Sequence, residues 1–148
     1  MSIRKSIVVV LSIFALLLIT PPPNSEELSK QQLQIQTELK EIFDANLQAC
    51  QDEDLDKALE ISVPENRHTL KPIFKSLFDM YDLSYRLDSF KLVSATEDSA
   101  VVEIVQITKK IKGPAFKDNK LTANFTFVRK EGKWYNTNVD LKEIEFLE

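Results

Sequence analysis

The chain has 148 residues, with 19 Lys and Arg against 23 Asp and Glu, one histidine and one cysteine. Without Arg4 and Lys5, which precede an apolar segment, 17 basic and 23 acidic side chains remain, a net charge of −6. This balance argues against nucleic acid as a partner, because phosphate backbones are bound by clustered Lys and Arg. A single cysteine, Cys50, excludes an intramolecular disulfide.

Residues 1–20 have the pattern of an export signal. Arg4 and Lys5 precede residues 7–19, an apolar run with one serine. Signals carry apolar runs of about 7 to 15 residues, whereas a spanning helix needs about 20. The segment before Thr20 lacks small residues for cleavage, so a cleaved signal and a retained anchor both stay open. We expect export from a bacterial cytoplasm to a periplasmic or extracellular location, with membrane contact through residues 7–19 if the segment is kept.

Three prolines in residues 21–24 predict a stiff spacer, followed by one domain over residues 25–148. Ser25 is the predicted N-cap of a first helix that continues to about Gln51. Asp54 is expected to cap a short second helix through Ile61, which Pro64 would end.

A third helix is predicted over residues 70–82, with Pro72 in its first turn. Its apolar stripe is the strongest core signal in the chain. The stripe consists of Leu70, Ile73, Phe74, Leu77, Phe78, Met80 and Tyr81.

From Leu83 onward the apolar period changes to two, which is typical of strands. The apolar phase shifts near Asp88 and again between Ile104 and Val105, so we predict a bulge in each of two long strands. A strand over residues 121–128 and a last one over residues 133–141 follow. The sequence therefore predicts an α+β fold, with three helices on one face of a strongly curved antiparallel sheet of four or more strands.

Two segments resemble the nuclear-transport-factor-2-like superfamily, also called cystatin-like or SnoaL-like. Residues 47–59 resemble its first-helix exit and second helix, and Glu131-Gly132-Lys133-Trp134-Tyr135 resembles the start of its final strand. The resemblance implies a cone-shaped roll around a long first helix, a scaffold shared by isomerases, dehydratases, cyclases, transport proteins and dimerisation modules. Enzyme members place an Asp–His pair, or Tyr and carboxyl groups, inside the cone. The only histidine here, His68, falls in a polar connection.

The favoured hypothesis is a non-enzymatic exported domain that binds a small apolar or amphipathic ligand, or a protein partner, at the concave sheet face. One alternative is a lyase or isomerase that uses Glu103, which apolar residues flank, together with Tyr85. Another is a structural module that forms a homodimer. No nucleotide loop, metal-ligand cluster or triad spacing occurs, so no cofactor or metal is expected. The candidate ligand-binding residues are Phe78, Tyr81, Tyr85, Phe125, Trp134 and Asn136.

Overall fold

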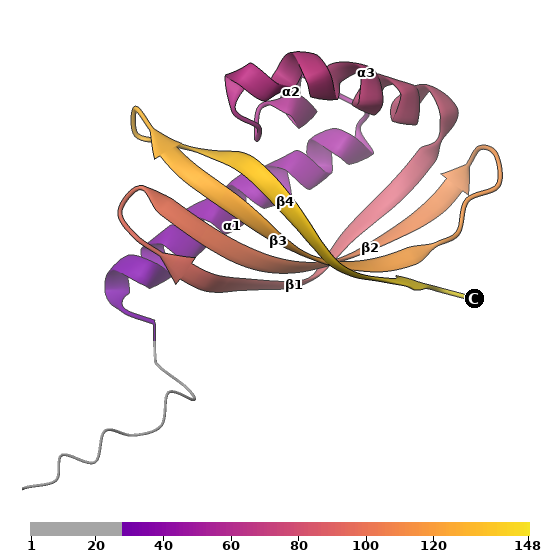
Figure 1. Cartoon of the computed structure of the whole chain (residues 1–148). Coiled ribbons are helices and arrows are strands. Elements are labelled where there is room, and N and C mark those ends of the chain that lie inside the picture. The colour runs from indigo at the N-terminus through magenta and orange to yellow at the C-terminus, as the bar shows by residue number, and fades with distance from the viewer. Residues whose placement is uncertain (1–27) are drawn as a thin grey trace, which may run out of the picture.

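The computed structural model describes residues 28–148 (Figure 1). The predicted signal, the proline spacer and the Ser25 cap lie outside the described residues. The first helix, α1 (Lys30–Gln51), has Ser29 as its N-cap, so the prediction that Ser25 caps this helix is wrong. The Ser29 hydroxyl accepts a hydrogen bond from the Gln32 backbone N–H at 3.2 Å, and the Gln32 side chain accepts one from the Ser29 N–H at 2.9 Å. This reciprocal pair is a capping box, which satisfies two N–H groups that the helix leaves free.

Two further helices follow, α2 (Leu55–Leu59), with the predicted Asp54 as N-cap, and α3 (Pro64–Met80). The prediction that Pro64 ends the second helix and that the third begins near Leu70 is wrong. Pro64 occupies the first turn of α3, where its missing N–H costs nothing, and Pro72 lies in the helix interior. His68 therefore lies within α3, where it is exposed, and not in a connection.

The sheet contains β1 (Asp82–Ala95), β2 (Ser99–Lys112), β3 (Asn119–Lys130) and β4 (Lys133–Phe146), all antiparallel and in that order. The predicted bulge near Asp88 is confirmed by a register shift between Leu87 and Ser89. The bulge expected between Ile104 and Val105 is wrong, because β2 pairs with β3 without interruption. Val105 lies on the outer face, half-buried.

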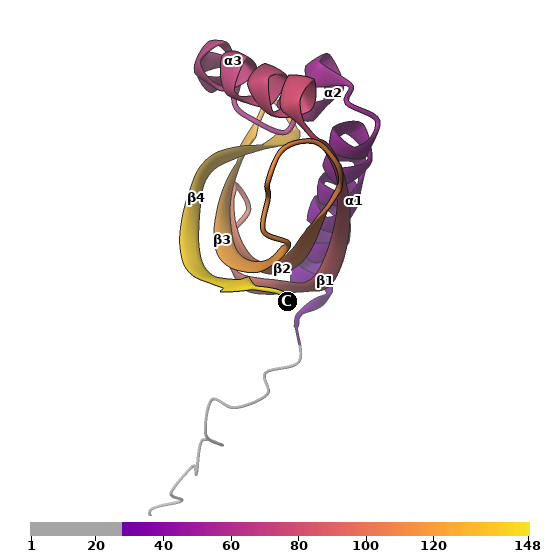
Figure 2. The same ribbon diagram turned by 90° about the vertical axis from the view of Figure 1, so that its right-hand side faces the viewer.

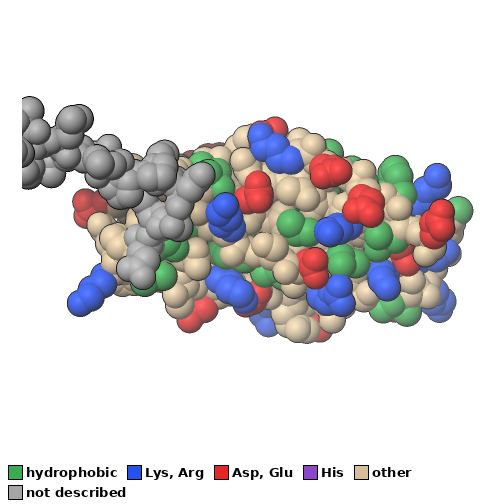
Figure 3. Space-filling model, turned by 90° about the horizontal axis from the view of Figure 1, so that it is seen from below, with side chains coloured by type: hydrophobic (Ala, Val, Ile, Leu, Met, Phe, Trp, Pro, Cys, Tyr) green, Lys and Arg blue, Asp and Glu red, His purple; other side chains and the backbone are tan. Residues whose placement is uncertain are grey.

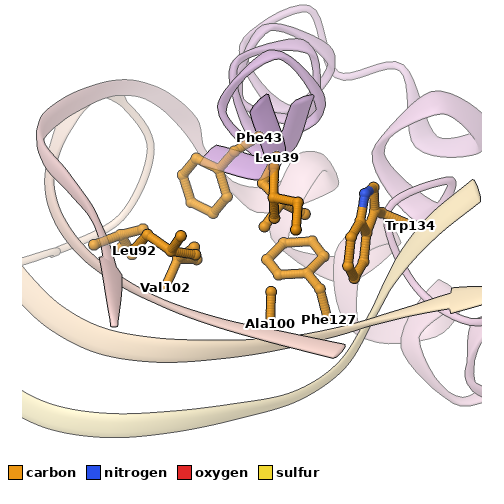
Figure 4. Close-up of a cluster of buried hydrophobic side chains, with 9 residues drawn as sticks. Leu39, Phe43, Leu92, Ala100, Val102, Phe127 and Trp134 are labelled. Carbon is orange, nitrogen blue, oxygen red and sulfur yellow. The ribbon is translucent and has the colours of Figure 1, made fainter. Parts of the chain in front are cut away.

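The sheet curls into an open trough (Figure 2), with α1 along one side and α2 and α3 across the top. Ile35, Leu39 and Phe43 of α1 pack against the concave sheet face (Figure 4). Their partners there include Val102 and Phe127, neither of which is exposed. Residues that pair across adjacent strands project to the same face. The register therefore assigns every other pair to the concave or to the outer face.

The α3 helix contributes less to the core than its stripe predicts, since none of its residues is fully buried. Phe74 and Phe78 are half-buried and pack, together with Tyr85, on a small cluster formed by Ala49, Cys50 and Ala58. Ile73 is 61% exposed. Helical periodicity shows which residues share a face, but not how closely that face is covered.

Candidate functional site

The concave face carries an exposed apolar surface along β4. Four β4 residues pair with Phe125, Ala123, Leu121 and Asn119 of β3, on the face that packs against α1. The four β4 residues are between 42% and 60% exposed, because α1 covers only part of the trough. We call this surface the β4 strip, which consists of Val139, Leu141, Ile144 and Phe146.

A bulge explains why these four side chains share one face. Leu141 pairs with Ala123, but the next pair joins Thr122 to Glu143, so Lys142 is the extra residue. Without it, strict alternation would send Ile144 and Phe146 to the outer face. The sequence prediction ended this strand at Leu141, where the period breaks, and it is five residues too short. The signal that was missed is the spacing of three between the apolar residues Leu141 and Ile144, which two charged residues separate.

The outer face of β4 is acidic. Asp140 pairs with Lys142 at 2.7 Å, whereas Glu143 and Glu145 have no salt bridge to any residue between 28 and 148. The side chains of residues 140–148 include four carboxylates and one lysine, a net charge of −3. The end of β4 is thus apolar toward the trough and negative on the other side.

β4 is also an edge strand of the sheet. At its beginning, the segment between α2 and α3 lies alongside it as a parallel bridge between Ser62 and Asn136. The Asn136 N–H donates to the Ile61 carbonyl at 2.6 Å, and the Val63 N–H donates to the Asn136 carbonyl at 3.1 Å. Beyond this bridge, no second strand within residues 28–148 pairs with the outer edge of β4.

Four of the predicted ligand residues lie on the concave side or next to it. Phe125 packs edge-on against Phe43, with ring centroids 5.1 Å apart. Phe78, a residue of α3, packs on the same buried cluster as Tyr85. Tyr81 follows α3 and packs against Phe116 at 5.4 Å. Tyr85 is in register with Thr108, Asn119 and Phe146, so it belongs to the same cross-strand row as the end of the β4 strip. Burial raises the pKa of Tyr85 to about 12, which keeps its phenol neutral.

The other two predicted residues, Trp134 and Asn136, also face the concave side, since they pair with Arg129 and Phe127, but both are buried in internal contacts. The Trp134 indole N–H donates to Glu38 at 3.0 Å, and Arg129 donates to the same oxygen at 2.9 Å. The Arg129 guanidinium also lies 4.5 Å from the centre of the Trp134 ring. The bond from Trp134 lowers the pKa of Glu38, with a further contribution from Arg129. The Asn136 amide donates to the carbonyls of Thr126 and Asn138, at 3.1 and 2.9 Å.

A groove of about 730 Å³ lies between α1, α2 and the start of β4. Carboxylates and cations are mixed along its walls, so they indicate no single ligand charge. The charged lining residues are Glu38, Glu41, Glu60, Lys57, Arg67 and Lys133.

The structure does not bring the predicted acid and its tyrosine together. Glu103 pairs with Lys91 and Asn124 on the outer face, opposite to the face of Val102, whereas Tyr85 packs on the concave side. The outer face mixes charges of both signs with scattered apolar side chains (Figure 3).

Cys50 is buried in the described domain, and burial raises the pKa of its thiol to about 11, so it stays protonated at neutral pH. From residue 28 onward there is no group of three or more His, Cys, Asp and Glu able to hold a metal. None of the helices described in that range is long and apolar enough to cross a membrane.

Solved structures share this architecture at low sequence identity. A candidate aromatic ring hydroxylase from Novosphingobium aromaticivorans aligns with a TM-score of 0.66 and 14% identity, over 78% of this chain and 94% of that one. A nuclear-transport-factor-2-like protein of unknown function from Pseudomonas putida KT2440 gives 0.64 and 11%, over 74% and 86%. The resemblance inferred from the sequence is therefore confirmed for the fold, which is the fold of nuclear-transport-factor-2-like proteins.

Residues 41–147 match the sequence profile of the C-terminal domain of anti-sigma-I factor RsgI9, and the chain belongs to this family. The anti-sigma-I factor RsgI9 of Acetivibrio thermocellus is 34% identical over 68 residues. These residues are 45% of this chain but 10% of that protein, so the match spans about a tenth of the length of the curated relative.

Proposed function

We propose that the chain is an exported binding domain, held at the outer side of the cytoplasmic membrane if residues 7–19 are retained, and that it engages a protein partner through the β4 strip. The observation that supports this most directly is the exposure of four large apolar side chains on one strand. Contiguous apolar surface on a soluble domain is costly in water and commonly marks an interaction site.

The family match supports binding of a protein partner rather than an enzymatic function. An anti-sigma factor is by name a protein that acts on another protein, and the relative carries that name. This chain corresponds to its C-terminal domain, so the sigma factor itself is not assigned to the β4 strip. Nor does the geometry favour the lyase or isomerase alternative, because Glu103 and Tyr85 lie on opposite faces of the sheet.

Two measurements test the proposal. A reporter enzyme fused after Glu148 is expected to be active only outside the cytoplasm. A photo-crosslinking amino acid at Ile144 is expected to yield an adduct of defined mass in cells. The same group at Lys91, which is exposed on the outer face, is expected to yield none. An adduct of twice the chain mass would instead support the homodimer. A cytoplasmic reporter signal, or equal labelling from both positions, would contradict the proposal.

A further inference from the structure

From the free edge of β4, we infer how the partner binds: an extended segment, in which apolar residues alternate with Lys or Arg, adds to the sheet alongside residues 138–146. This inference rests on the proposed function, since it specifies the partner of the β4 strip. It requires a free backbone edge, an apolar row and an acidic row on the same strand. β4 provides all three.

The backbone edge is already used in this way at its other end. Residues 61–63 lie beside Asn136 and exchange two backbone hydrogen bonds with it. The chain thus shows that the outer edge of β4 accepts an added strand. The remaining residues 138–146 extend over about 30 Å, at about 3.3 Å per residue. Peptides that add to an open sheet edge obtain their affinity from such main-chain hydrogen bonds.

The side chains of β4 determine what the added strand must carry. A strand alternates its side chains between the two faces, so one set lies beside the β4 strip and the other beside Glu143 and Glu145. Apolar residues suit the first set, because Leu141 and Ile144 are half exposed. Basic residues suit the second, since opposite charges across adjacent strands attract. Glu145 is opposite Lys120 of β3 and Glu143 is opposite Thr122, and neither carboxylate forms a salt bridge with another described residue.

A second copy of β4 fits this edge poorly. Pairing β4 with itself would bring together two copies of residues 138–146, whose three carboxylates and one lysine give a net charge of −2, and carboxylates opposite each other are destabilising. The bulge at Lys142 adds a further restriction, because bulges and charges on edge strands prevent unselective pairing. Pairing of this edge with a second copy of β4 is therefore unfavourable, whereas pairing with a basic strand is favoured.

The test uses a fluorescent nine-residue peptide in which Lys and Val alternate, titrated into the full chain in lipid nanodiscs and followed by anisotropy. Two modified peptides carry N-methyl groups on alternate residues, one set in each phase. In an added strand, alternate backbone N–H groups point toward β4, so only one of the two methylation patterns blocks the N–H groups that bond to it. That peptide is expected to bind at least about tenfold more weakly through loss of several hydrogen bonds, while the other still binds. Equal effects of the two phases would overturn strand addition.

Charge is tested with a double variant, Glu143→Lys and Glu145→Lys. It is expected to weaken binding of the Lys-Val peptide by about tenfold. The matched control, Glu97→Lys and Glu131→Lys, makes the same charge change in exposed hairpin turns and is expected to change binding by less than about twofold. A Glu-Val peptide is expected not to bind, and if it bound as well as the Lys-Val peptide, the charge argument would fail.

Sedimentation of the chain without peptide tests whether a second copy of the chain occupies this edge. A dimer that dissociates in the Glu143→Lys and Glu145→Lys variant would assign the edge to a second copy and overturn the inference. The proposed function fails independently, because it depends on crosslinking from Ile144. If Ile144 gives an adduct but both N-methylated peptides lose the same affinity, the β4 strip remains the binding face and strand addition is rejected.

Discussion

The three-residue contact among Glu38, Arg129 and Trp134 predicts an acid-sensitive contribution to stability. It connects α1 to β3 and β4 across more than 90 residues of sequence, through two hydrogen bonds to one carboxylate oxygen. Hydrogen bonds to a charged group contribute about 1.5 to 3 kcal/mol when buried. Because the Glu38 side chain is 36% exposed, solvent screening reduces the value, and Glu38→Gln is expected to cost about 1 kcal/mol at pH 7.

The pH dependence follows from the lowered pKa of Glu38. A carboxyl with a lowered pKa in the folded state stabilises the fold above its ordinary pKa, about 4.3, and the contribution is lost as pH falls through the lower folded value. The full chain and the Glu38→Gln variant are therefore expected to differ at pH 7 and to converge in acid.

Urea unfolding, followed by the fluorescence of Trp134, the sole tryptophan, measures the free energy of unfolding of both proteins at pH 7 and in acid. Glu41→Gln is the control, since Glu41 is exposed on the same helix and has no salt bridge to another described residue. Equal stabilities of the two variants at pH 7, or a Glu38→Gln cost that persists unchanged below the lowered pKa, would refute this account of the contact.

Other predictions concern the core, the edge and the bulge. Phe127→Ala is expected to cost about 3 to 5 kcal/mol in urea unfolding, against less than about 0.5 for the exposed control Ile73→Ala; similar costs would contradict the core assignment. Asn136→Ala is expected to cost about 1 kcal/mol, because the partly buried carbonyls of Thr126 and Asn138 each lose one donor, although the Thr137 hydroxyl still donates to Thr126 at 3.3 Å; no loss would show that water replaces the amide. Residues 25–148 are expected to be soluble and folded by circular dichroism, and insoluble material would contradict that boundary. Deleting Lys142 is expected to abolish crosslinking from Ile144, which Lys142→Ala preserves, and retained crosslinking in the deletion would contradict the phase argument.

The sequence predicted the order of the elements because local signals are strong here. Asp54 caps α2 as expected, and the phase change near Asp88 is a real bulge. The prediction was wrong where one residue type has two roles. Proline both ends and begins helices, so Pro64 was assigned to the wrong side of a boundary.

The candidate site was less predictable, since it depends on what is left uncovered. Phe125 and Tyr85 lie on the concave side of the sheet, and their role in ligand binding stays a prediction. Sequence parity left the facing of Trp134 open, and the structure buries it against Glu38. The exposure of Ile144 and Phe146 depends on how far α1 reaches across the trough, and that is a tertiary property.

The two ends of β4 illustrate how one strand serves two purposes. Near Trp134 and Asn136, the concave face and the outer edge are occupied by the chain's own groups, so this end is fixed by packing and hydrogen bonds. Past the Lys142 bulge, the same strand keeps its pairing with β3, its concave side chains Ile144 and Phe146 are 42% and 60% exposed, and no other strand of residues 28–148 pairs with its outer edge. A strand anchored at one end and paired along one side holds its free groups in place without a partner. Binding there would lose little conformational entropy from the domain, and this favours selective recognition by a short segment.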